Sequence, residues 1–398
     1  MWLKNSKAKN LYMANEFDVI VIGVGSMGSS TCYQLASRGV SVLGLEQFSI
    51  PHDQGSHAGQ SRIIRKAYFE HADYVPLLER AYDNWKHLES ITGSQVYFPT
   101  GLLYAGKPDE ILIKGVKHSS EKYNVPIESV SKQELEKRFP QFQVPDDYEV
   151  LFEPDAGFVT PERAVTLYVE QAIKAGATIH SNEQTRSWKQ NETSIEVVTN
   201  KGTYLCKKLV IAAGAWTDKM LPELSTRLQV TRQVIAWLNP KGQEQFELGN
   251  FPCWLIDDHT QAGMYYGFPA LSTDKFGAPA GLKVAHHYPG LPTHADSVDR
   301  KVSAEEEQTI VQSISKFLPN GYESMSVLKT CLYTNTPDEN FIIDFVPESN
   351  KNVIMAAGFS GHGFKFVSVV GEIVADLSSM GSTQLPIKFL ALSRLFRA

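Results

Sequence analysis

The sequence predicts a two-domain α/β (α+β) protein, in which a Rossmann-like domain with a parallel sheet is interleaved with a domain built on a mainly antiparallel sheet. Two observations support this class. An apolar run at residues 17–22 leads into a glycine-rich turn, and a second apolar run follows at residues 40–45. This order of strand, turn, helix and strand is typical of a parallel sheet. Residues 263–268 and 282–287 instead alternate between apolar and polar side chains, as strands with one solvated face do.

The turn after the first strand carries three glycines, Gly23, Gly25 and Gly28. Gly23 allows a tight turn, Gly25 lets a phosphate group approach the backbone, and Gly28 lets the following helix pack close to the strand. We expect that helix over residues 26–38, with Gly39 as its stop. The free N–H groups at its start would face the phosphates. The pattern therefore predicts a dinucleotide-binding site.

Glu46 closes the second apolar run, eighteen residues beyond Gly28. A carboxylate at this place accepts hydrogen bonds from the hydroxyl groups of the adenosine ribose and repels a 2′-phosphate. NADP is therefore disfavoured, whereas the choice between NAD and FAD stays open on this pattern alone.

Other segments extend the same sheet from distant parts of the chain. Residues 205–213 and 352–357 are apolar runs that stop at glycine, which predicts two more strands, and residues 162–175 and 372–377 have helical character. We expect a discontinuous cofactor domain of residues 15–90, 150–220 and 325–390, and a substrate domain of residues 91–149 and 221–324.

Composition and charge narrow the class of protein. The 398 residues carry a formal net charge of −6, and no basic block offsets it, which argues against a nucleic-acid partner. No apolar run approaches the length of a membrane span, and the first fifteen residues lack the apolar core of a signal peptide. We therefore expect a cytoplasmic protein with no membrane partner.

The four cysteines are widely scattered, and none of them forms a CxxC pair. This spacing suggests neither a zinc site nor a disulfide framework, and we expect no metal. We expect three of them to be small buried apolar residues, namely Cys32, Cys206 and Cys253.

Several segments together resemble the FAD-dependent amine oxidases typified by monomeric sarcosine oxidase and N-methyltryptophan oxidase. The resemblance spans nearly the full chain in the family's order, and its most specific part is Gly358-Phe359-Ser360-Gly361-His362-Gly363-Phe364-Lys365-Phe366. The matching segments are residues 23–28 with Glu46, then 55–65, 265–269, 281–283, 331–333, 337–344 and 358–366.

The resemblance implies a substrate site. Arg65 and Lys365 match the positions that hold the substrate carboxylate, which two cations would grip by charge-assisted hydrogen bonds. Tyr266 matches a tyrosine that lines the substrate pocket. Leu255 matches a pocket-wall position at which some relatives carry methionine.

The resemblance also implies the catalytic residues. Lys283 matches a lysine that assists the reaction with oxygen, where a desolvated cation stabilises developing negative charge. His287, on the same face of the strand, matches an active-site histidine. Arg62 matches an arginine near the flavin ring, and Tyr266 is the fourth implied catalytic residue.

Cys331 matches the position where the family forms a thioether to the flavin 8-methyl group, so the resemblance implies covalent FAD. The sequence departs from the family pattern near the flavin, where Ala58 replaces a histidine that the family commonly has. The implied cofactor residues are Gly23, Gly25, Ser26, Met27, Gly28, Glu46, Gln47, Ser56, His57, Arg62, Gly214, Trp216, Cys331, Tyr333, Gly358, Gly361, His362, Gly363, Phe364 and Lys365.

By this resemblance the protein oxidises the secondary amine of an N-methyl amino acid such as sarcosine and reduces O₂ to hydrogen peroxide, as a monomer. Alternatives within the class are a cyclic imino acid such as proline or pipecolate as substrate, or an electron acceptor other than O₂. A non-catalytic flavoprotein is disfavoured, because the charged and titratable residues of the site are all present.

Overall fold

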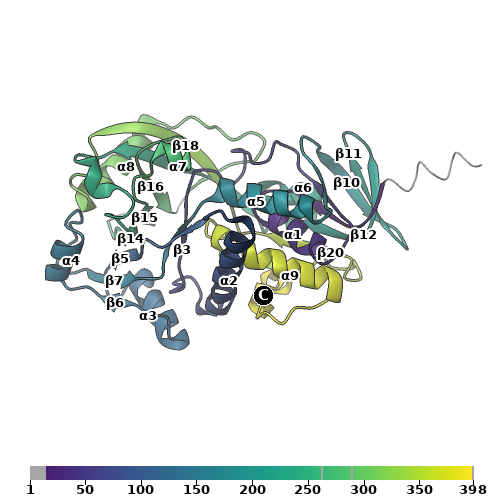
Figure 1. Ribbon diagram of the computed structural model, residues 1–398, viewed down its shortest axis with the longest axis horizontal. Helices are drawn as coiled ribbons and strands as arrows, with labels where there is room; N and C mark the ends of the chain where they lie inside the picture. Colours follow the sequence, from purple (N-terminus) through teal and green to yellow (C-terminus); the bar gives the residue numbers. More distant parts are fainter. Residues whose placement is uncertain (1–14, 261–262, 288–289, 397–398) are drawn as a thin grey trace, which may run out of the picture.

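The computed structural model describes residues 15–260, 263–287 and 290–396. The segment that ends at residue 14, on which the expectation of no signal peptide rests, lies outside this range. Two large sheets occupy opposite halves of an elongated molecule, with strand β3 (Arg62–Ile64) and helix α2 (Val75–Thr92) between them (Figure 1). The predicted mixed α/β class is confirmed.

The first sheet has a parallel centre in the order β20-β12-β1-β2-β9. Three strands pair antiparallel at its margin, namely β10, β11 and β19. The apolar runs that predicted strands all contribute to this centre. The bounds are β1 (Glu16–Ile22), β2 (Val42–Leu45), β9 (Thr178–His180), β10 (Thr185–Gln190), β11 (Ile195–Thr199), β12 (Thr203–Ile211), β19 (Ile342–Phe345) and β20 (Val353–Ala357).

Both faces of this sheet are buried, as is usual for parallel sheets. In β1, Val19 and Val21 belong to one core cluster, while Ile20 and Ile22 belong to another on the opposite face. Three helices pack together over the first face, and α1 contacts both of the others. They are α1 (Ser26–Ala36), α5 (Pro161–Lys174) and α9 (Val367–Met380).

The second sheet follows the order β17-β13-β16-β15-β14-β5-β7-β6, and β18 pairs with β13. Its described pairs are antiparallel except for β5 with β14. The bounds are β5 (Leu102–Gly106), β6 (Glu128–Ser129), β7 (Glu149–Glu153), β13 (Gln229–Asn239), β14 (Cys253–Asp257), β15 (Met264–Gly267), β16 (Leu282–His287), β17 (Leu291–Pro292) and β18 (Ser324–Asn335).

Sheet membership differs from the expected segmentation at two strands. We assigned residues 150–220 and 325–390 to the cofactor domain, but β7 and β18 pair within the second sheet. Their partners are non-local in sequence, and no local pattern marks them. The remaining helices of this half are α3 (Ile111–Tyr123), α4 (Lys132–Arg138), α7 (Thr273–Phe276) and α8 (Ala304–Phe317).

A third, small sheet joins the two halves. Strand β8 (Gly157–Val159) pairs antiparallel with both β3 and β4 (Tyr97–Phe98), and Arg62 lies opposite Val159. Arg62 begins β3 and Arg65 follows its end, so this short ladder sets where both arginines lie. The chain also contains α6 (Thr217–Met220) and short 3₁₀ turns at Gly214–Trp216 and Phe364–Phe366.

None of the helices in the described part of the chain has the length and apolar character that a bilayer crossing needs. Over the same residues, we found no cluster of three or more His, Cys, Asp or Glu side chains that could bind a metal ion.

Candidate active site

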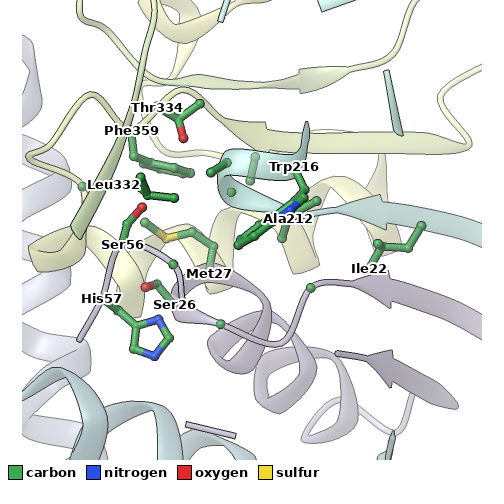
Figure 2. Close-up of a pocket in the computed structure, with 18 of the residues that line it drawn as sticks. Ile22, Ser26, Met27, Ser56, His57, Ala212, Trp216, Leu332, Thr334 and Phe359 are labelled. Atoms are coloured by element: carbon green, nitrogen blue, oxygen red, sulfur yellow. The ribbon is translucent and has the colours of Figure 1, made fainter. Parts of the chain in front are cut away.

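A long cavity runs across the carboxyl ends of the parallel strands (Figure 2). The turn between β1 and α1 lines it, and so do Leu332 to Thr334 of β18, a strand of the second sheet. Its walls include Gly23, Gly25, Ser26, Met27, Glu46, Gln47, Ser56, His57, Arg62, Gly214, Trp216, Tyr333, Gly358, Gly361, Gly363 and Phe364, all predicted cofactor residues.

The glycine turn has the geometry that the sequence predicts. Gly23 has a φ of +89°, and a Cβ atom on Gly28 would lie 1.7 Å from the Gly23 carbonyl oxygen. No room for a side chain therefore exists where α1 meets the strand. At Gly25, by contrast, an added Cβ would meet no atom closer than 3.8 Å. Gly25 offers no side chain to cap α1, so the first turn of the helix can present its N–H groups to an anion.

Glu46 is buried and braces this turn. One carboxylate oxygen accepts a hydrogen bond from Val24 N–H at 2.9 Å, and the other accepts one from Phe48 N–H at 3.0 Å. Burial raises the pKa of Glu46, against the effect of these bonds. Because each carboxylate oxygen has a second lone pair, the group can also accept hydrogen bonds from ribose hydroxyls.

Two buried polar atoms fit a polar cofactor in this cavity. His57 Nε2 and Thr334 Oγ1 both belong to wall residues, and neither atom has a hydrogen-bond partner among the described residues. Buried polar atoms without partners are rare, because each costs about 1–3 kcal/mol. Together with the open glycine turn and Glu46, these atoms suit a dinucleotide such as FAD.

A second, smaller cavity of about 60 Å³ adjoins the first, and Arg62, Gly361 and Phe364 line both. Segments far apart in the sequence form it, and it gathers most of the residues predicted for substrate binding and catalysis. Its walls are Arg62, Ile63, Arg65, Phe69, Glu70, Leu255, Tyr266, His287, Gly361, His362, Phe364 and Lys365.

The charge in this cavity is mostly positive. Arg65 is buried and forms a two-point ion pair with Glu70, with both Nη2 to carboxylate oxygen distances at 2.7 Å. Burial would raise the pKa of Glu70, but Arg65, His362 and Lys365 lower it to about 2. Burial, aided by neighbouring Arg65, lowers the pKa of Lys365 to about 7. The Lys365 ammonium donates to the carbonyl oxygen of His362 at 2.7 Å.

Glu70 was missed in the sequence analysis. It is one of many glutamates in the sequence, and its role depends on the bend after β3 that returns it to Arg65. Only its spacing of five residues from Arg65 could have suggested a pair.

Two histidines of the smaller cavity are neutral at physiological pH. Burial lowers the pKa of His287 to about 3 and that of His362 to about 4. His287 Nδ1 lies 3.3 Å from the Tyr333 hydroxyl oxygen. His362 Nδ1 lies 2.5 Å from the Tyr68 hydroxyl oxygen, and its Nε2 lies 2.9 Å from the Glu339 carbonyl oxygen.

Lys283 is held beneath the segment that carries Arg62. Its side chain is 1% exposed, and its ammonium donates to the carbonyl oxygens of Gly59 at 2.6 Å and Ser61 at 2.5 Å. The rings of Trp237 and Phe268 flank it. Burial and the nearby Arg62 lower the pKa of Lys283 well below its usual value. Lys283 is not among the described residues that line either cavity.

Cys331 is also buried, and burial raises the pKa of its thiol. It lines a third cavity of about 420 Å³ together with Gly59, Gln60, Glu162 and Trp237. The next residues of β18, from Leu332 to Thr334, line the long cavity. The other three cysteines are buried and free, as expected.

Four of the predicted cofactor residues are not on the walls of the long cavity. Gly28 acts through the packing of α1, and Cys331 faces the third cavity. His362 and Lys365 line the smaller cavity, because the backbone turns at Gly361, with a φ of +75°. Wall residues that the sequence analysis missed include His52, Glu183, Gln184, Thr185, Ala212, Lys219, Met220, Thr334 and Ser360.

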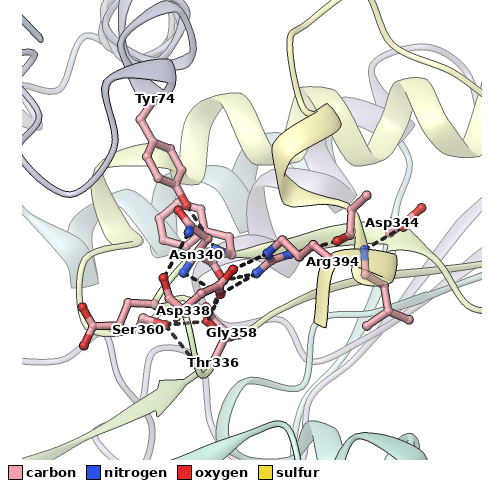
Figure 3. Close-up of polar contacts among 12 residues, drawn as sticks. Tyr74, Thr336, Asp338, Asn340, Asp344, Gly358, Ser360 and Arg394 are labelled. Atoms are coloured by element: carbon pink, nitrogen blue, oxygen red, sulfur yellow. Dashed lines mark hydrogen bonds and ion pairs between the residues drawn. The ribbon is translucent and has the colours of Figure 1, made fainter. Parts of the chain in front are cut away.

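Polar contacts connect the segment 336–344 with the loop after β20 and with Arg394 (Figure 3). Asp338 binds Arg394, with a distance of 2.8 Å between Oδ2 and Nε, and accepts a bond from the Thr336 hydroxyl at 3.1 Å. Thr336 N–H in turn donates to the Ser360 hydroxyl at 3.2 Å. Thr336 and Asp338 thus connect the loop that follows β20 with Arg394, near the end of the described residues.

Comparison with known proteins defines the class. The family described as FAD dependent oxidoreductase matches residues 18–377. A monomeric sarcosine oxidase of Streptomyces avermitilis is 38% identical over 97% of this chain and 100% of its own length. An N-methyl-L-tryptophan oxidase of Yersinia pestis is 32% identical over 95% of this chain and 99% of its own. The resemblance inferred from the motifs is confirmed.

Solved structures agree on the fold. NikD, an unusual amino acid oxidase essential for nikkomycin biosynthesis, superimposes with a TM-score of 0.82 at 25% identity, over 95% of this chain and 97% of its own. Fold, cavity and comparisons thus define a flavin-binding oxidoreductase. The chain belongs to the FAD dependent oxidoreductase family.

We expect Glu46→Ala to weaken FAD binding about tenfold or more, since charge-assisted hydrogen bonds contribute about 1.5–3 kcal/mol. The measurement is titration of cofactor-free protein with FAD, followed by flavin fluorescence, in a Cys331→Ser background that cannot retain FAD through a thioether. Glu170→Ala, on the exposed face of α5, is the matched control. An unchanged dissociation constant would show that the carboxylate does not contact the cofactor.

Proposed function

We propose that the protein uses FAD to oxidise the secondary amine of a small N-methyl amino acid such as sarcosine. The products are formaldehyde, the demethylated amino acid and hydrogen peroxide. The observation that carries the proposal is the small cationic cavity, which shares Arg62, Gly361 and Phe364 with the cofactor cavity. A substrate held there lies beside the cofactor. Its partners are this small molecule and O₂. We expect the enzyme to act as a monomer, as the names of the sarcosine oxidase relatives say of those proteins.

Arg65 and Lys365 would hold the substrate carboxylate. Both are buried cations on the wall of the cavity, and planar guanidinium groups bind carboxylates through two parallel hydrogen bonds. In the structure the carboxylate of Glu70 already forms an ion pair with the Arg65 guanidinium. An incoming carboxylate therefore shares Arg65 with Glu70 or displaces it, and Lys365 offsets the added negative charge.

The size of the cavity favours a small substrate. A volume of about 60 Å³ corresponds to about two water molecules at about 30 Å³ each, so the cavity suits only a compact amino acid. Phe69, Leu255 and Tyr266 close the sides. An indole side chain would need these residues to move, which disfavours N-methyltryptophan.

The remaining residues would orient the reaction and tune its electrostatics. Bound FAD would supply the two-electron redox chemistry between the N-methyl carbon and O₂. Neutral His287 and Tyr266 add no charge beside the amine, so the substrate nitrogen can lose its proton before oxidation. Loss of two electrons and a proton from the N-methyl carbon leaves an iminium, which water hydrolyses to formaldehyde and the demethylated amino acid. Arg62 and the protonated form of buried Lys283 supply positive potential that stabilises the negative charge developing on oxygen.

We also propose that Cys331 anchors FAD covalently. The thiol is buried and belongs to β18, whose following residues line the cofactor cavity. Arg62 and Lys283 oppose the effect of burial on its pKa and would favour the thiolate. Ala58, in place of a histidine, would slow attachment without preventing binding.

Covalent attachment has a direct test. We expect flavin absorbance to remain with the denatured polypeptide, and the intact mass to include the mass of FAD. Cys331→Ser should release flavin on denaturation, whereas Cys253→Ser, another buried free cysteine, should not. Release from the unsubstituted protein would contradict the attachment.

The substrate is tested by anaerobic addition of sarcosine, N-methyltryptophan, proline and pipecolate to the purified flavoprotein. We expect sarcosine to bleach the flavin absorbance fastest. Lys365→Met should raise the sarcosine concentration for half-maximal bleaching about tenfold or more, through loss of a charge-assisted bond. Lys174→Met, at an exposed position of α5, is the control. Faster bleaching by proline or pipecolate would make a cyclic imino acid the substrate instead.

The affinity for a substrate-like carboxylate should fall as pH rises. Methoxyacetate has the shape of sarcosine but no titrating amine. Because the pKa of Lys365 is about 7, its charge is present below that pH and lost above it. We expect the dissociation constant to rise about tenfold between pH 6 and pH 8, measured by perturbation of the flavin spectrum. In Lys365→Met the dependence should vanish, since His287, His362 and Glu70 have pKa values of about 3, 4 and 2.

A further inference from the structure

Two carboxylates that the proposed reaction does not use grip the chain on either side of β3. Glu162, at the start of α5, accepts hydrogen bonds from Gly59 N–H at 2.6 Å and Gln60 N–H at 3.2 Å. Its side chain lines the third cavity. The bonded amides are consecutive, so a single carboxylate fixes the backbone immediately before β3.

Glu153, at the end of β7, makes the matching contact after β3. It is completely buried and accepts hydrogen bonds from Lys66 N–H at 2.6 Å and Ala67 N–H at 3.2 Å. The Tyr104 hydroxyl donates to the same carboxylate at 2.6 Å. Burying a carboxylate is costly unless its oxygens are satisfied, and here three donors satisfy them.

The two glutamates flank one short stretch of sequence. Strand β8 lies between them in the chain and pairs with β3 from Arg62 to Ile64. A three-residue ladder would allow the ends of such a short strand to fray. The segment from residue 153 to residue 162 therefore holds residues 59–67 at three places, namely a central ladder and a carboxylate at each end.

Each end holds a different cation of the site. At the first end, the carbonyl oxygens of Gly59 and Ser61 accept the bonds from the Lys283 ammonium. Gln60 has a φ of +65°, which non-glycine residues rarely adopt, so the surrounding contacts must stabilise it. At the second end, the carbonyl oxygen of Ala67 accepts a bond from Arg65 Nη1 at 3.0 Å.

We propose that Glu162 and Glu153 are positioning residues that serve different halves of the reaction. Glu162 sets the carbonyl oxygens that hold Lys283, and so the reaction with O₂. Glu153 sets the backbone that orients Arg65, and so the binding of the substrate carboxylate. The assignment of the two halves rests on the proposed function, whereas the gripping of the backbone does not.

Hydrogen exchange tests whether the two carboxylates hold the backbone amides, without reference to activity. In the holoenzyme, Glu162→Ala should speed amide exchange in a peptide covering residues 57–61, and Glu153→Gln in one covering residues 65–69. Glu162→Gln should restore most of the protection, because Oε1 alone accepts from both amides. In Glu153 the two oxygens accept from different amides, so Gln loses one of these bonds. Glu170→Ala on α5 and Glu149→Gln on β7 are the controls. Exchange that is unchanged, or faster throughout the protein, would overturn the proposal.

Rapid kinetics tests whether Glu162 serves the reaction with O₂ and Glu153 serves substrate binding. We expect Glu162→Ala to slow reoxidation by O₂ about tenfold while the sarcosine concentration for half-maximal anaerobic bleaching changes less than about twofold. Glu153→Gln should give the reverse. If Glu153→Gln does not fold, Tyr104→Phe removes one donor from the same carboxylate and should shift the sarcosine dependence in the same direction. Equal losses in both steps would overturn the division. Failure of sarcosine to bleach the unsubstituted enzyme would refute only the proposed function. The exchange result would still decide whether Glu162 and Glu153 hold the backbone on either side of β3.

Discussion

The site depends on the burial of positive charge with few anions to balance it. Four basic residues lie in the interior or at its edge, namely Arg62, Arg65, Lys283 and Lys365. Among the described residues, the one direct ion pair to any of them is that between Glu70 and Arg65. Buried charge is expensive unless hydrogen bonds satisfy it. Backbone carbonyl groups meet this need, since Lys283 and Lys365 both donate to them.

This constraint explains why irregular backbone surrounds the cavities. Carbonyl groups within helices and strands already accept hydrogen bonds, so they have little capacity for an ammonium group. The chain supplies them from the loop that precedes β3 and from the turns around Gly361. Such loops hold their shape only when the rigid elements beside them are well packed. The two sheets and the acidic segment 336–344 provide that support.

The sequence predicted the features that local patterns encode. The strands around Gly23, the helix after it and Glu46 were recognisable, because a close approach such as that of Gly28 to the Gly23 carbonyl leaves no alternative to glycine. Contacts between distant segments were not recognisable. The assignment of β7 and β18 depends on pairings that no local spacing encodes. Glu70 lies close to Arg65 in the sequence, but their ion pair depends on the bend after β3. The resemblance assigns His362 to the cofactor, and the structure places His362 on the wall of the smaller cavity, just after the turn at Gly361.

Arg62, Gly361 and Phe364 belong to the walls of both cavities, so neither cavity is complete in isolation. A ligand that orders these three residues in one cavity also prepares them for the other. Thermodynamic linkage then makes the effect reciprocal: whatever factor FAD contributes to the affinity for the amino acid, the amino acid returns to the affinity for FAD. A protein loaded with both ligands should resist unfolding more than the two separate binding energies would suggest.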